Sequence, residues 1–144
     1  MKQASSRRPT KTITQTVFLP AKPDRIYKAF LNARAHAAFT GAGATCDAKV
    51  GGDFTAYDAY IWGKILGLDE NRKITQHWQT TEWPDGAPPS TVEFTFSEKD
   101  GGTELKMVQC DVPAEQAESY RQGWIDYYWE PLKTHFARIN PNRR

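Results

Sequence analysis

The side chains best suited to catalysis or metal binding lie far apart in this sequence. His36, His77 and His135 lack the short spacing that brings two imidazoles onto one metal ion. No serine stands in a G-x-S-x-G turn, and Cys46 and Cys110 do not form a C-x-x-C pair. These spacings predict neither an activated nucleophile nor a metal centre.

Glycine pairs and neighbouring carboxylates give two weaker signs of chemistry. The glycine pairs at 51–52 and 101–102 match neither of the glycine patterns that bind phosphates, so we interpret both as turns. Asp53 and Asp58 are near enough in sequence to act as paired carboxylates, but their position beside a turn favours two solvated side chains. We therefore expect a protein that is not an enzyme and that needs no cofactor or metal.

Aromatic residues are the strongest functional signal, because Phe, Trp and Tyr make up 12% of the sequence and bury large areas. We expect ten side chains to converge on one interior space, where they could line a pocket for an apolar ligand: Phe39, Phe54, Tyr57, Trp62, Gln76, Trp78, Phe94, Met107, Trp124 and Tyr128. Polar groups for such a pocket would come from Tyr57, Gln76, Gln109 and Tyr127. A filled aromatic core is the alternative interpretation.

Two further tryptophans are candidates for contact with a partner protein. Trp83 lies in a proline-rich loop, and Trp129 is offset from the apolar face of the last helix. Exposed aromatic side chains often mark binding hot spots. We expect both on the outer surface, with burial under neighbouring loops as the alternative.

Composition and charge limit the class of protein. The 144 residues fit one domain, 39% are hydrophobic and 25% charged. Of the 19 basic residues, seven lie in the first eleven or last seven positions, so residues 12–137 hold twelve basic and 17 acidic residues, a net charge of −5. A nucleic-acid-binding domain would instead carry positive charge on a folded face. No apolar run approaches the roughly 20 residues that span a bilayer, and no secretory leader is evident, so we expect a cytoplasmic protein.

The first half of the chain must place these aromatic residues on a strand and two short helices. The β-branched segment 12–19 predicts a strand. Pro23 suits the first turn of a helix, and apolar residues then recur at spacings of three to four up to a break near Asn32. Short alternating segments punctuated by glycine predict strands at 53–57 and 60–68. In the latter, we assign Trp62 and Leu66 to one face and Ile61, Gly63 and Ile65 to the other.

The second half predicts a hairpin and a long helix. Strands are expected at 73–82, 91–97 and 103–110, with a tight turn at 99–102 joining the last two. After Pro113 an apolar stripe continues for about 25 residues, which predicts a helix with a kink at Pro131: Ala117, Tyr120, Trp124, Tyr127, Tyr128, Leu132, Phe136 and Ile139. The fold class is α+β, a curved antiparallel sheet of six to seven strands around a long C-terminal helix. The domain spans 12–139, between a disordered basic tail at 1–11 and a basic tail at 140–144.

Six segments in this order also resemble a known family: FTGA at 39–42, VGGDF at 50–54, ITQHW at 74–78, WPDG at 83–86, GTEL at 102–105 and GWIDYYWEPLK at 123–133. They are similar to the C-terminal domain of the activator of heat-shock-protein-90 ATPase, a branch of the START-related helix-grip superfamily. The resemblance covers about residues 12–138. It implies a co-chaperone or stress-response protein that binds a heat-shock-protein-90 chaperone or another protein. The alternative function is binding or transport of a small apolar molecule between sheet and helix.

Overall fold

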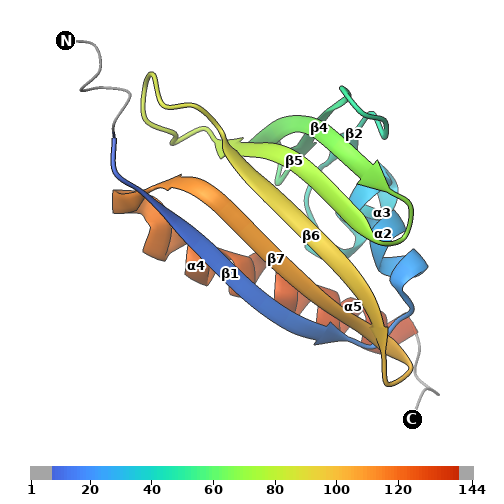
Figure 1. The fold of residues 1–144 in the computed structure, drawn as a ribbon. Helices are drawn as coiled ribbons and strands as arrows, with labels where there is room; N and C mark the ends of the chain where they lie inside the picture. The colour runs from blue at the N-terminus through green and yellow to red at the C-terminus, as the bar shows by residue number, and fades with distance from the viewer. Residues whose placement is uncertain (1–7, 140–144) are drawn as a thin grey trace.

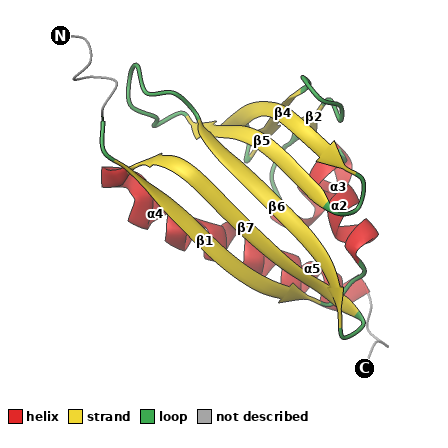
Figure 2. Cartoon of the chain, in the orientation of Figure 1, coloured by secondary structure: helices red, strands yellow, loops and turns green. Residues whose placement is uncertain are grey.

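Alternating apolar and polar residues build seven strands into one antiparallel sheet in the computed structural model, which describes residues 8–139 (Figure 1). The strands are β1 (Thr10–Leu19), β2 (Thr45–Cys46), β3 (Asp53–Ala56), β4 (Ile61–Asp69), β5 (Lys73–Thr80), β6 (Ser90–Lys99) and β7 (Gly102–Pro113). Their order across the sheet is β1-β7-β6-β5-β4-β3-β2. The sheet curves over the helical elements, which confirms the expected helix-grip class (Figure 2). Of the tails expected at 1–11 and 140–144, residues 1–7 and 140–144 lie outside the described residues, whereas Thr10 and Lys11 already belong to β1.

Two short helices follow β1, as the sequence predicts. They are α2 (Pro23–Leu31) and α3 (Ala33–Thr40), separated by the single residue Asn32. The Asn32 side chain accepts a hydrogen bond from the Ala35 amide at 2.9 Å and so caps α3. Gly41 ends α3 in the left-handed conformation, with a φ of 78°.

The long C-terminal helix is built from four consecutive elements: η1 (Ala114–Gln116), α4 (Ala117–Trp124), η2 (Ile125–Trp129) and α5 (Glu130–Ile139). The segment η2 is a π-helix, in which the Glu130 amide bonds to the Ile125 carbonyl five residues earlier. The irregularity expected at Pro131 is therefore a π turn that ends just before it. None of the helices in residues 8–139 is long and apolar enough to cross a membrane.

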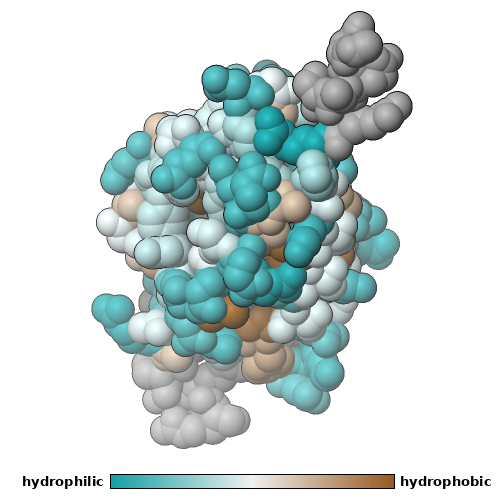
Figure 3. Space-filling model, turned by 90° about the vertical axis from the view of Figure 1, so that its left-hand side faces the viewer, coloured by the Kyte–Doolittle hydropathy of each residue, from teal (hydrophilic) through white to brown (hydrophobic). Residues whose placement is uncertain are grey.

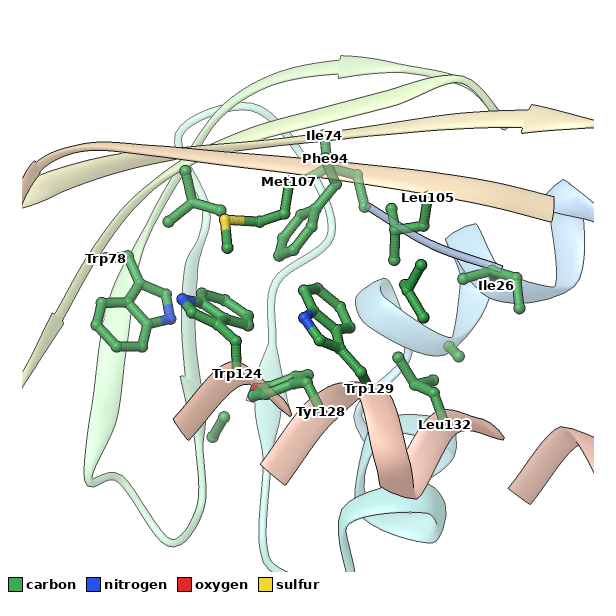
Figure 4. Packing of buried hydrophobic residues seen from close by; sticks show 14 of the residues in the cluster. Ile26, Ile74, Trp78, Phe94, Leu105, Met107, Trp124, Tyr128, Trp129 and Leu132 are labelled. Carbon is green, nitrogen blue, oxygen red and sulfur yellow. The ribbon is translucent and has the colours of Figure 1, made fainter. Parts of the chain in front are cut away.

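The main core lies between the inner face of β6 and β7 and the long helix (Figure 4). Phe94 pairs with Met107 across these strands, and both are buried as expected. Trp124 and Trp129 rise from the helix towards them. On the face of the molecule shown in Figure 3, hydrophobic side chains reach the surface in small areas between hydrophilic ones.

The orientation expected for Trp62 is wrong. Trp62 and Leu66 point outwards from β4 and are 44% and 38% exposed, whereas Ile61 and Ile65 face the core. Gly63 explains the choice of face, because a Cβ there would lie 2.0 Å from the His77 carbonyl oxygen. The inner side of β4 therefore has no room for a bulky side chain at this point, and Trp62 cannot join the interior set.

Candidate functional site

The space directly beneath the long helix is almost filled. A cavity of about 20 Å³ remains there, bordered by six members of the expected set: Phe54, Gln76, Trp78, Phe94, Trp124 and Tyr128. This volume suits about one water molecule rather than a ligand. Phe39 and Met107 are packed in the core. For this part of the molecule the filled aromatic core is the better interpretation.

A larger space opens beside the helix, between the β3–β4 turn and the face formed by α4 and η2. This tyrosine groove has a volume of about 450 Å³ and is lined by Tyr57, Tyr60, Ile61, Trp78, Ser119, Tyr120, Gly123, Trp124, Tyr127 and Tyr128. Its volume falls in the usual range of ligand pockets, roughly 300–1,000 Å³. Four members of the expected set, Tyr57, Trp78, Trp124 and Tyr128, line it, so the structure moves the candidate pocket from the interior to the side of the helix.

One wall of the tyrosine groove depends on an unusual turn. Tyr57, Asp58 and Ala59 have φ values of 51°, 57° and 69°, a run of left-handed residues without glycine. Such residues cost roughly 1–2 kcal/mol each and often occur at functional sites. Two hydrogen bonds hold the turn, from the Asp58 amide to the Gly43 carbonyl (3.0 Å) and from the Gly43 amide to Asp58 Oδ1 (2.8 Å). The turn brings Tyr57 and Tyr60 to the groove.

The opposite wall depends on the π turn. Trp124 and Trp129 are five residues apart and stack with ring centroids at 5.4 Å and an interplanar angle of 17°. Trp129 Nε1 donates to Gln15 Oε1 at 2.7 Å, and Gln15 Nε2 donates to the Arg121 carbonyl at 3.0 Å. That carbonyl is open to a side chain because the Ile125 amide bonds to Gln122 instead.

The expected surface position of Trp129 is therefore wrong. Regular α-helical spacing would place it beside the buried stripe, but the wider π turn brings it inwards together with Tyr128. Pro131 favours this irregular turn because it has no N–H to bond the Tyr127 carbonyl four residues earlier. The Tyr57 hydroxyl donates to that carbonyl at 2.6 Å and thereby joins the two walls of the groove.

Trp83 is also buried, contrary to expectation. Its ring packs against Trp78 and Tyr120, at centroid distances of 6.2 and 5.8 Å. Its Nε1 donates to the Pro88 carbonyl at 3.0 Å, so the proline-rich loop folds back over its own tryptophan. Neither tryptophan proposed for partner contact is available at the surface.

Most phenol groups of the tyrosine groove already have protein partners. Tyr60 donates to Glu82 Oε1 at 2.8 Å, the Tyr120 oxygen lies 2.7 Å from Thr80 Oγ1, and the Tyr128 oxygen lies 3.0 Å from His36 Nε2. Burial raises the pKa values of Tyr57 and Tyr60 to about 12 and raises that of Tyr128 as well. Tyr57, Tyr60 and Tyr128 therefore stay neutral near pH 7, with their oxygens bonded to protein atoms and their rings lining the groove.

A buried polar chain runs from the indole of Trp124 to the backbone carbonyl of Trp78. Trp124 Nε1 donates to Gln109 Oε1 at 2.8 Å, Gln109 Nε2 donates to Ser90 Oγ at 3.0 Å, and Ser90 Oγ donates to the Trp78 carbonyl at 2.6 Å. Gln109 was expected to serve a pocket, but it is fully buried and joins the helix to the sheet. The Trp78 indole nitrogen is buried and has no partner among the described residues.

His36 has the most strongly lowered pKa among the described residues. Burial lowers its pKa to about 4, so the ring is neutral near pH 7. No group of three or more His, Cys, Asp or Glu side chains within residues 8–139 could hold a metal ion. The sequence analysis did not select Tyr60, Ile61 or Gly123 as groove residues. The turn at 57–59 that shapes the groove is left-handed but contains no glycine, so the sequence does not reveal it.

An antiparallel sheet that curves around a long helix, with two short helices after the first strand, is the architecture of the helix-grip class. The family model described as "Activator of Hsp90 ATPase homolog 1-like protein" matches residues 20–137, and the chain belongs to this family.

Individual relatives agree with this assignment. The chain is 36% identical over 129 residues to the activator of 90 kDa heat shock protein ATPase homolog 1 of Homo sapiens and 35% identical to that of Mus musculus. Each match covers 90% of this chain, and the chain spans 38% of the length of each relative. The crystal structure of an HSP90 activator from Plasmodium falciparum shares the fold, with a TM-score of 0.73, 24% identity, and coverage of 94% of this chain and 97% of that one.

Proposed function

We propose that this chain is a non-catalytic binding domain that binds a 90 kDa heat shock protein and raises its ATPase rate. The observation that carries the proposal is the 36% identity to a named ATPase activator over 90% of the chain. Activation would follow from preferential binding to the ATPase-competent conformation of the chaperone, which increases the population of that conformation. The proposal implies a cytoplasmic location beside the chaperone.

The chemistry of the described side chains supports a binding role rather than a catalytic one. His36 is enclosed by rings and shares its Nε2 with the Tyr128 hydroxyl. Its low pKa comes from burial, not from a partner carboxylate or an opening towards a substrate. Gln109 and Ser90, two other polar side chains of the interior, are engaged in structural hydrogen bonds.

The outer face of β4 is the proposed contact surface, in place of Trp83 and Trp129. Trp62 and Leu66 project from this face and are the two exposed large apolar side chains of β4. Lys64 lies between them and bonds Asp53 on β3 at 2.9 Å. A partly exposed tryptophan beside charged groups is a frequent hot spot of protein interfaces.

The test is the ATPase rate of the 90 kDa heat shock protein from the same organism, with and without equimolar protein. We expect the wild-type protein to raise the rate and Trp62→Ala to remove at least half of the increase. Phe18→Ala is the matched control, because Phe18 is also 44% exposed but lies on β1 at the opposite edge of the sheet. A folded wild-type protein that leaves the rate unchanged would refute the proposal, and equal losses in both variants would refute the assigned surface.

A further inference from the structure

Most cations of the described residues lie beside a carboxylate. Of the 15 lysines and arginines within residues 8–139, nine have a carboxylate oxygen within 3.8 Å. Four of the six without such a partner in this part of the chain lie on the helices α2, α3 and α5: Arg25, Lys28, Arg34 and Arg138. The other two, Lys11 and Lys106, lie on β1 and β7. Positive charge without a carboxylate partner is therefore concentrated on the short helices and the end of the long one.

These helices meet at one corner of the molecule. The helix α3 packs against both α2 and α5, and the Phe39 ring of α3 lies 6.5 Å from the His135 ring of α5 (Figure 1). Burial, Arg138 and Arg25 together lower the pKa of His135, so two arginines more than 100 positions apart act on one imidazole. Lys28 follows Arg25 by about one helical turn. We call the exposed cations Arg25, Lys28 and Arg138 the basic corner.

The basic corner is electrostatically unfavourable in the free protein. Arg25 lies in the first turn of α2, where the positive end of the helix dipole favours an acidic side chain such as Asp24. Lys28 and Arg138 add like charges nearby. The helix dipole accounts for Arg138, because it lies in the last turn of α5, but it does not account for Arg25. Side chains that oppose the local preferences of a fold are expected mainly at functional sites.

Carboxylates on the neighbouring elements do not neutralise the basic corner. Glu98 lies 2.7 Å from Lys22, and Glu130 lies 3.5 Å from Lys133, so both already have a cation of their own. Asp24 is next to Arg25 in the sequence, and it is a single carboxylate beside three cations. The corner therefore keeps an excess of positive charge on a domain whose residues 12–137 carry a net charge of −5.

We propose that the basic corner binds a short acidic segment of a partner protein, whose Asp and Glu side chains pair with Arg25, Lys28 and Arg138. A single phosphate group is bound best by donors that converge on one point, whereas these cations are exposed on two separate helices. A long polyanion such as nucleic acid would extend from the corner over the acidic remainder of the domain and be repelled there. Several carboxylates on a short segment match the charges without this repulsion. The surface is distinct from the outer face of β4.

The test measures binding of an octapeptide of alternating Asp and Glu residues, labelled with tetramethylrhodamine, by fluorescence anisotropy. The same peptide with Asn and Gln is the neutral control. We expect the wild-type protein to bind the acidic peptide at low salt and to bind the neutral one at least about tenfold more weakly. Added salt should weaken binding of the acidic peptide, because the cations of the basic corner are exposed.

Charge reversal locates the binding surface. The double variant Arg25→Glu/Arg138→Glu should bind the acidic peptide at least about fivefold more weakly. The matched control is Lys11→Glu/Lys106→Glu, which changes the net charge equally at the two cations without a carboxylate partner that lie away from the corner. It should bind within about twofold of the wild type, since exposed charges beyond a Debye length are screened. All four side chains are exposed, so both variants are expected to fold, and circular dichroism checks this.

Three results would overturn the proposal. The first is equal affinity of the wild type for the acidic and neutral peptides, and the second is an equal loss in the two double variants, which would reflect net charge alone. The third is tighter binding of a short DNA duplex than of the acidic peptide, which would assign the corner to phosphates. If Arg138→Glu loosens the end of α5, the single variants Arg25→Glu and Lys11→Glu decide. No chaperone is present in the titration, so its outcome is independent of the ATPase test.

Discussion

The two ends of the long helix meet the same sheet in different ways. At the α5 end, Leu132 and Phe136 are buried against the core, and α3 covers the helix from the side. At the end formed by α4 and η2, the tyrosine groove of about 450 Å³ stays open, and Tyr127 is 58% exposed. The difference shows that, within one fold, apolar packing can fill the space between sheet and helix in one half while the same space stays open in the other.

Hydrogen bonds keep the groove end open. Tyr57 bridges the walls through the Tyr127 carbonyl, and Gln15 holds the carbonyl of Arg121 in the same helix. At the closed end, aliphatic and aromatic side chains pack against each other; Tyr27 of α2, for example, meets Phe96 of β6 edge-on at 5.8 Å. Apolar side chains stabilise the fold by filling space, so they leave few gaps between them. Hydrogen bonds have a defined direction and length, so they can hold two walls in place with a gap between them.

The largest expected difference between the two ends is in the response to truncation. Leu132→Ala should lower the free energy of unfolding by about 3 kcal/mol, because it leaves a cavity at a fully buried position. Tyr127→Ala removes a larger side chain, yet it should change the free energy by less than about 0.5 kcal/mol, since that side chain is mostly exposed. Urea unfolding of both variants measures this. Similar losses would mean that the groove end is packed as tightly as the closed end.

Between these ends, His36 should make stability depend on pH. Burial lowers its pKa from 6.5 to about 4, so the unfolded chain takes up the proton first and the folded state loses stability as the pH falls from 6.5 towards 4. From pH 7 to pH 5 the expected loss is about 2 kcal/mol. Burial and nearby Arg138 and Arg25 also lower the pKa of His135, so the effect must be isolated by a variant.

His36→Gln provides that comparison, because glutamine keeps a polar side chain and takes up no proton in this range. Its free energy of unfolding should change less than that of the wild type between pH 7 and pH 5, and the difference is the contribution of His36. Equal pH dependence in the two proteins would show that His36 is accessible to protons in the folded state.

The closed half of the molecule was the predictable one. Strict alternation placed Val92, Phe94 and Phe96 on the inner face of β6, and the expected turn forms with left-handed Asp100 and Gly101. These features depend on neighbours in sequence, which is the information that periodicity carries. The apolar stripe of the helix was likewise correct up to Phe136, except at Tyr127, which is 58% exposed.

The groove half was less predictable because distant residues define it. Trp129 turns inwards through a π turn whose freed carbonyl and indole are both held by Gln15, more than 100 residues away. The left-handed turn at 57–59 contains no glycine, so no local rule announces it. Trp83 is buried by the fold of its own loop, and composition alone does not show which way a loop closes.

Replacing a glycine by alanine should change the free energy of unfolding with opposite signs at the two ends. Gly123→Ala should raise the free energy of unfolding by about 0.5–1 kcal/mol, because alanine favours the helix and its Cβ meets only an ordinary contact beside the groove. Gly102→Ala at the start of β7 should instead destabilise the protein, since its Cβ would lie 2.5 Å from the Leu19 carbonyl oxygen. Thermal unfolding of the two variants compares them directly. A destabilised Gly123→Ala would mean that the groove narrows in solution, and the walls joined by Tyr57 would then pack against each other like the closed end.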